Sequence, residues 1–196
     1  MPVPKGTPLD PARTRKTVLA SATPLLYARG LDGIGIAELC ATLGISKETL
    51  YRHFGSRTGL VQAVLDARSD RVVDWLGAAV AAAGEDPADR IAALFDALRT
   101  WYASPAFRGC AIVNAATQHH EDPARAIAAR HLGRCRDLLT GIAEQAGAAD
   151  PAALGRQLLI VLEGATVVAD HHSTGPEAAD DAKAAALALL AHASRK

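Results

Sequence analysis

The stretch "GISKETLYRHF", residues 44–54, decides the fold. Within it only Leu50 and Phe54 are large apolar side chains. At about 100° per residue these two lie on one side of a helix, while Glu48 and Arg52 point directly away. A helix this short is not stable by itself. Other helices must therefore hold its apolar side and leave its polar side facing outward.

The outward side of this helix has the chemistry of an anion-binding surface. Thr49 and Tyr51 lie on its flanks, and Lys47 and His53 lie at the edges of the buried side. Side chains of these types donate hydrogen bonds to phosphate oxygens and base edges. Ser46 falls on the inward side and suits the N-cap position. This pattern predicts contact with nucleic acid, whereas an ordinary solvated helix usually carries Glu, Lys and Gln.

The charges of the chain are unevenly distributed, although they sum to zero. Residues 1–68 hold nine Lys and Arg against five Asp and Glu, and residues 69–196 hold twelve against sixteen. A basic first part and an acidic remainder indicate that the first part meets an anion. Chance scatter of surface charge is the alternative interpretation.

Composition favours an all-helical protein of 196 residues. Apolar residues make up 49% of the chain but aromatic residues only 4%, and β-branched runs are few. Cys40, Cys110 and Cys135 form no close pair, which indicates neither a disulfide framework nor a zinc cluster. The opening residues lack the apolar segment of a secretory signal, and no uninterrupted apolar run is long enough to span a membrane. We expect a cytoplasmic protein with no cofactor, no metal and no membrane partner.

Proline and glycine mark the breaks between helices. Asp86, Asp122 and Asp150 suit N-caps, and the proline after each suits the first helical position. Gly30 suits a helix end and Pro24 falls inside a helix. With the helix that Ser46 caps, about nine helices are expected, the others over residues 13–29, 36–43, 57–83, 87–103, 105–120, 123–146, 151–172 and 176–194.

Helix, glycine-containing turn and helix together form the helix-turn-helix arrangement. The segment "VLASATPLLYARGLDGIGIAELCATLGISKETLYRHFGSRTGLVQAVL", residues 18–65, resembles the DNA-binding domain of the TetR family of bacterial transcriptional regulators (TetR/AcrR type). The elements that carry the resemblance are Gly30, "IAELCATLGIS", "TLYRHF" and "SRTGL". The resemblance implies a DNA-binding domain over residues 9–69 and an effector-binding and dimerisation domain over residues 70–196.

The resemblance also implies roles for individual residues of the first domain. Lys47 and Thr49 would contact bases or the adjacent DNA backbone. The phosphates would be bound by Tyr51, His53 and Arg57. Glu48 and Arg52 would contribute to the choice of DNA site. The chain departs from the family pattern at Gly35, where Ser or Thr is common, so we expect a weaker N-cap on the second helix.

For the second domain the resemblance implies a homodimer. The helices within residues 151–194 would form a four-helix bundle with the same pair of a second copy, with Leu162 and Val168 on the shared face. The partner DNA would be a near-palindromic double-stranded operator. Alternatively, both helices simply pack on other helices of the same chain.

An effector pocket is expected within residues 61–145. "FRGCAIVNAATQHH", residues 107–120, resembles the corresponding segment in one branch of the family. An apolar wall with a few polar groups is typical of a pocket for a small, mostly apolar molecule. The alternatives are that these side chains form ordinary core and that Cys110 is a redox or electrophile sensor. The residues assigned to the pocket are Trp101, Tyr102, Phe107, Cys110, Asn114 and Gln118.

Together these features predict a ligand-responsive DNA-binding regulator, a repressor that releases its operator on binding a small molecule. It would act in the bacterial cytoplasm and on the nucleoid when bound to DNA. A hydrolase using Cys110 or Cys135 with a histidine, and a helical interaction module, are alternatives of other classes. Adjacent histidines on a helix point about 100° apart and cannot chelate a metal together. We therefore expect solvated or partly buried histidines at His119, His120, His131, His171 and His172.

Overall fold

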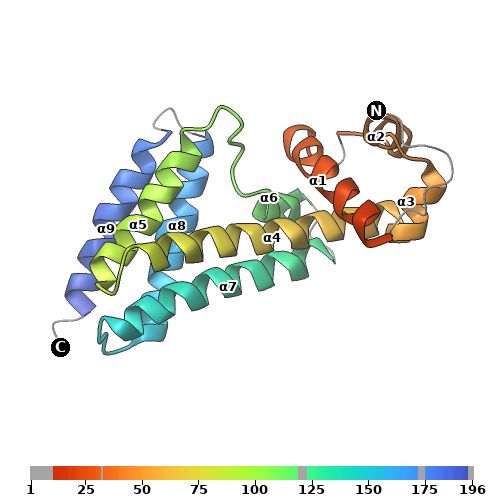
Figure 1. Cartoon of the computed structure of the whole chain (residues 1–196). Coiled ribbons are helices and arrows are strands. Elements are labelled where there is room, and N and C mark those ends of the chain that lie inside the picture. Colours follow the sequence, from red (N-terminus) through yellow and green to blue (C-terminus); the bar gives the residue numbers. More distant parts are fainter. Residues whose placement is uncertain (1–10, 32, 119–122, 172–174, 194–196) are drawn as a thin grey trace. The chain divides into compact units, whose positions relative to one another are not determined.

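The computed structural model describes residues 11–31, 33–118, 123–171 and 175–193, and every regular element in these ranges is a helix (Figure 1). The prediction of an all-α protein is confirmed. The chain forms two compact units, Met1–Arg68, here called the head, and Ser69–Lys196, here called the body. The helices are α1 (Pro11–Arg29), α2 (Ile36–Leu43), α3 (Lys47–Phe54), α4 (Arg57–Ala82), α5 (Pro87–Tyr102), α6 (Ala111–Gln118), α7 (Ala124–Gln145), α8 (Pro151–His171) and α9 (Glu177–Ala193).

The head is built around short helices that share one small apolar core. Helix α2 packs against both α1 and α3. Gly44 ends α2 in the left-handed conformation, with φ 66°, and its N–H bonds to the end of that helix. A glycine adopts this conformation without the steric cost of a side chain. The core side chains of the head are Val18, Ala22, Leu26, Leu31, Ile34, Leu39, Cys40, Leu50, Phe54, Leu60, Val64 and Leu65.

Helix α3 begins as its N-cap predicts. The Ser46 hydroxyl oxygen accepts a hydrogen bond from the Thr49 backbone N–H at 3.0 Å. Ser46 itself is exposed, so the prediction that it lies on the inward side with Leu50 and Phe54 is wrong. The reason is that a capping residue precedes the first helical turn and has extended dihedral angles, so its side chain turns back to the helix end.

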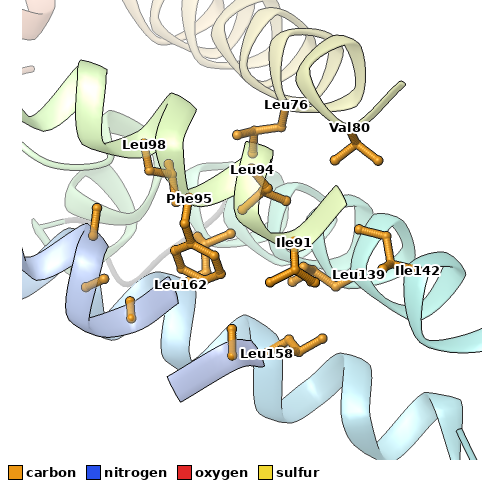
Figure 2. Close-up of a cluster of buried hydrophobic side chains, with 14 of the residues drawn as sticks. Leu76, Val80, Ile91, Leu94, Phe95, Leu98, Leu139, Ile142, Leu158 and Leu162 are labelled. Carbon is orange, nitrogen blue, oxygen red and sulfur yellow. The ribbon is translucent and has the colours of Figure 1, made fainter. Parts of the chain in front are cut away.

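The body is a bundle of long helices around one core. Helix α9 packs against α5 and α8, and α8 packs also against α7 (Figure 1). Figure 2 shows Ile91, Leu94 and Phe95 of α5 pointing into the core toward side chains of α7 and α8. Alanines of α9, including Ala179 and Ala186, are buried in the same core, where small side chains permit close approach of helices.

Most predicted helix ends agree with the structure. The Asp86 carboxylate caps α5 by accepting from the Ala88 N–H at 2.7 Å, and Asp150 accepts from the Ala153 N–H at 2.9 Å. Pro123 was predicted at the first position of α7, but it occupies the N-cap, and the helix begins at Ala124. The predicted cap Asp122 lies outside the described residues.

The predicted helix over residues 105–120 is wrong at its start, since α6 begins only at Ala111. Gly109 has a φ of 69° in the preceding turn. A Cβ at Gly109 would lie 2.7 Å from the Asp170 Oδ2 atom of α8 and 3.2 Å from the Asn114 Nδ2 atom. Glycine thus permits both the backbone conformation and the close packing that delay the helix.

Helix α8 has two apolar sides. Leu162 is buried in the core of the body, so its predicted place on a face shared with a second copy is wrong. Ile160, Val167 and Val168 are instead 71%, 53% and 46% exposed. By length and composition alone α8 could cross a membrane, but core helices of soluble proteins meet the same criterion. Its buried side packs against α7 and α9, which is how a core helix of a folded bundle behaves.

Candidate functional site

Helix α3 presents its polar side to solvent, as its spacing predicts. Leu50 and Phe54 are buried, whereas Tyr51 is 45% exposed. The Arg52 guanidinium donates to the Glu48 carboxylate at 2.9 Å across one helical turn, and both side chains are exposed. An exposed ion pair of this kind contributes only about 0.3–0.5 kcal/mol to the stability of the helix. Both groups can therefore exchange this bond for a bond to a ligand at little cost. Of the other predicted contacts, Lys47 is exposed and Thr49 and His53 are half-buried.

Arginines of the neighbouring helices hold α3 in position. The Arg15 guanidinium of α1 lies over the Phe54 ring, 4.7 Å from its centroid, and donates to the His53 carbonyl at 3.2 Å. The Arg57 guanidinium donates to the Ile34 carbonyl at 2.9 Å and to the Leu31 carbonyl. Arg57 thus has a structural role that the sequence did not indicate, and its predicted phosphate contact stays a prediction.

The second helix has the weak start that was predicted. Gly35 occupies the N-cap of α2, and no side chain caps the helix there. The first turn of α2 is tied to α1 instead, through an ion pair between Glu38 and Arg29.

Three of the residues assigned to the effector pocket meet in an aromatic cluster in the body. The Trp101 ring lies edge-on to Phe107 with centroids 4.8 Å apart, and Phe107 lies 4.9 Å from Tyr102. Trp75 of α4 approaches Trp101 at 6.1 Å. The Tyr102 hydroxyl lies 2.8 Å from the hydroxyl oxygen of Thr166 on α8. We call Trp75, Trp101, Tyr102 and Phe107 the aromatic cluster.

Asn114 and Gln118 of α6 are two further residues that were assigned to the pocket. The Asn114 amide donates to the Arg108 carbonyl at 2.9 Å and so holds the turn before α6. Gln118, near the end of α6, is exposed. Neither observation identifies a polar anchor for a ligand, and the assignment of both residues to a pocket remains a prediction.

Cys110 belongs to a buried polar group that the sequence did not reveal. Its sulfur lies 3.8 Å from the His131 Nε2 atom, and the Cys135 sulfur lies 3.9 Å from the same atom. The other ring nitrogen, Nδ1, lies 3.0 Å from the hydroxyl oxygen of Ser69 on α4. His131 is only 2% exposed, so the expectation of a solvated or partly buried histidine is wrong for it. The sequence did offer one indication of this group, because His131 and Cys135 are four residues apart and so lie on one side of a helix.

The Cys135 thiol is buried in the body. Burial, with a smaller contribution from the charge of Glu163, raises the pKa of Cys135 to about 12, so this thiol stays protonated at neutral pH. In the part of the chain that the structure describes, no three His, Cys, Asp or Glu side chains are arranged to hold a metal ion. His119, His120 and His172 lie outside that part, and His171 is exposed at the end of α8.

Glu163 of α8 is a further residue whose special environment the sequence did not indicate. Burial raises the pKa of its carboxyl to about 7. Glu163 is itself half-buried, and its charge adds a smaller contribution than burial does to the raised pKa of Tyr102 and of Cys135. A carboxyl with this pKa inside a helical bundle destabilises the fold when it is ionised.

Comparison with known proteins identifies the class of fold. The family described as bacterial regulatory proteins, tetR family, matches residues 18–64. The HTH-type transcriptional regulator AlkX of Mycobacterium tuberculosis is 38% identical over 63 residues, which cover 32% of this chain and 30% of AlkX. The match thus spans less than a third of AlkX.

Solved structures resemble the chain over almost its full length. SCO4454, a TetR-family transcriptional regulator from Streptomyces coelicolor, shares 26% identity with a TM-score of 0.85, over 94% of this chain and 97% of that chain. A Streptomyces avermitilis protein (sav143), described as a TetR-type transcriptional regulator, shares 30% identity with a TM-score of 0.75, over 92% and 97%. Fold and comparisons define a transcription regulator with a helix-turn-helix. The chain belongs to the TetR family, whose regulators bind DNA operators and dimerise.

The raised pKa of Glu163 predicts a stability that depends on pH. In the unfolded chain the carboxyl has its ordinary pKa of 4.5, and in the folded chain about 7. As the pH rises from 4.5 to 7 the unfolded state gains more from losing the proton, so this group destabilises the fold increasingly and then constantly above pH 7. Glu163→Gln should therefore raise the free energy of unfolding by about 2–3 kcal/mol at pH 8 and by less than about 1 kcal/mol at pH 5.

Urea denaturation at the two pH values measures this difference. Glu144→Gln is the matched control, because Glu144 is exposed on α7. The same change in stability at pH 5 and pH 8 for Glu163→Gln would show that the Glu163 carboxyl titrates normally.

Proposed function

We propose that this protein is a dimeric repressor that binds a near-palindromic operator and releases it on binding a small molecule. The outward polar side of α3 carries this proposal, since two buried side chains, Leu50 and Phe54, hold it facing solvent. Membership of the TetR family and the basic balance of the head support it. Two copies of α3, held by a dimer, would enter successive major grooves of the DNA. The cell compartment that follows from this function is the bacterial cytoplasm.

Tyr51 and Arg52 should contribute to DNA binding in different ways. Tyr51→Phe removes one donor to a phosphate and should weaken binding to every operator variant by about 1 kcal/mol. Arg52→Ala should instead change the preference at particular base pairs, where a bidentate contact is worth about 1–3 kcal/mol. An operator selected from randomised DNA, and its single-base variants, would be titrated by fluorescence anisotropy.

Arg136→Ala provides the control, because Arg136 is an exposed arginine of α7. It should leave both affinity and preference unchanged. If Arg52→Ala weakens binding equally for all operator variants, Arg52 does not read bases. If the wild-type protein selects no DNA sequence, the proposed function is wrong.

Dimerisation is proposed for the exposed apolar side of α8. Ile160, Val167 and Val168 lie at helical spacing and are about half or more exposed in one chain. A second copy covering them would remove this apolar surface from water. Val168→Glu should then bury an unpaired charge at the interface, which costs several kcal/mol. Sedimentation should show monomers that bind the operator weakly.

The same substitution on α7, Ala129→Glu, is the control, since Ala129 is exposed on a helix outside the proposed interface. It should leave the protein dimeric. A dimeric Val168→Glu variant would place the interface elsewhere. Leu162 is unsuitable for this test, because a charge there would disrupt the core of a single chain.

A second candidate function is that Cys110 senses electrophiles. The observation that favours it is the His131 imidazole 3.8 Å from the Cys110 sulfur, a base that can take up the thiol proton as sulfur attacks. N-ethylmaleimide should then modify Cys110 before the other two cysteines and lower operator affinity, and Cys110→Ser should abolish both effects. Peptide mass spectrometry identifies the adduct. Equal modification of Cys40 and Cys135 would argue against a sensor.

A further inference from the structure

The Glu163 carboxylate has no partner inside the part of the chain that the structure describes: no hydrogen bond or ion pair joins it to another residue there. Glu163 is partly buried, so its carboxylate can also meet a molecule from outside the chain. Polar groups that are held away from water are usually paired, so a carboxylate without a partner needs an explanation. Burial lowers stability whenever this carboxyl is ionised, and a glutamine of the same shape would avoid that cost. A residue that costs stability in this way is typical of a binding site.

The position of Glu163 places it beside the aromatic cluster. It precedes Thr166 by three residues, so both side chains lie on one side of α8. The Thr166 hydroxyl contacts the Tyr102 hydroxyl at 2.8 Å, and Tyr102 packs on Trp101 and Phe107. Burial is the main cause of the raised pKa of Tyr102, and the negative charge of Glu163 raises this pKa further. One carboxylate thus lies at the edge of a group of aromatic rings.

The aromatic cluster is itself unusual for this chain. Only eight of its residues are Phe, Trp or Tyr, and both tryptophans belong to the cluster. Trp75 is more than a third exposed, so the cluster reaches solvent through this ring. Aromatic faces carry negative potential and attract organic cations, most strongly at tryptophan. A carboxylate added to such faces favours a cation over a neutral molecule of the same shape.

We propose that Glu163 and the aromatic cluster bind an organic cation, a molecule with an apolar body and one quaternary or protonated nitrogen. The charged centre lies against the Glu163 carboxylate and the apolar body against Trp101 and Phe107. This inference rests on the proposed function, because it names the chemical class of the effector. The expected effector, a small and mostly apolar molecule, would thus also carry one positive charge. The acidic balance of residues 69–196 also favours a cation over an anion.

The two tryptophans make the site observable in the full-length protein, since all tryptophan fluorescence comes from Trp75 and Trp101. Two pairs of probes differ in charge but hardly in shape: phenyltrimethylammonium with neutral tert-butylbenzene, and tetraphenylphosphonium with anionic tetraphenylborate. At least one cation should change the fluorescence saturably at pH 8, and its uncharged or anionic counterpart should bind about tenfold more weakly. Glu163→Gln should weaken binding of the cation about tenfold and leave the counterpart unchanged.

Glu144→Gln is again the matched control, and it should bind the cation as the wild type does. The inference is overturned if neither cation changes the fluorescence at millimolar concentration, or if a cation binds equally well to the Glu163→Gln variant that a thermal melt shows to be folded. It is also overturned if the substitution changes only the dimer dissociation constant, because the carboxylate would then pair with a second copy.

The experiments distinguish a failure of the cation site from a failure of the proposed regulator function. The fluorescence titration contains no DNA, so cation binding without any operator binding would contradict only the proposed regulator. Operator binding by a protein that ignores both cations would contradict only the cation site. Release of the operator by the bound cation, lost in Glu163→Gln, would support both.

Discussion

The head depends on one constraint, which is that an eight-residue helix cannot exist in water without support. Leu50 and Phe54 provide the support from inside, and the Arg15 guanidinium covers the Phe54 ring from α1. With its inner side fixed in this way, α3 cannot rotate without exposing both apolar side chains. Its outward residues are therefore held in a defined direction before any DNA is present, which lowers the entropy lost on binding.

The body differs from the head because its interior contains polar side chains that are not needed to stabilise a helical bundle. The contact of Tyr102 with Thr166 and that of His131 with Ser69 satisfy their polar atoms, so these pairs cost little. Glu163 has no such partner among the described residues, and burial raises the pKa of its carboxyl to about 7. An apolar core of the same size would be more stable. An unpaired carboxylate in a helical bundle is a local departure from the most stable arrangement, of the kind that functional sites show.

The sequence predicted the features that depend on local chemistry. Ser46 and Asp86 cap their helices, and Gly44 turns the chain, because each acts through backbone atoms a few residues away. Features that depend on distant residues were missed. His131 and Ser69 are 62 residues apart, and no spacing along the chain indicates that they meet. Leu162 was misplaced for a related reason, since α8 is apolar on two sides and periodicity cannot tell which side the same chain covers.

Helix α4 belongs to both units, since Arg68 ends the head and Ser69 begins the body. Leu60 and Val64 pack within the head, whereas the Ser69 hydroxyl contacts His131 and Asp70 pairs with Arg134 of α7 at 2.7 Å within the body. In the proposed repressor, a ligand in the body would act on the head through α4, provided that it binds one arrangement of α4 and α7 more tightly than another. A hundredfold difference in operator affinity requires only about 2.7 kcal/mol of such preference. One ion pair with a carboxylate in a water-poor site is of this order, so a single charged contact would suffice for the proposed release of the operator.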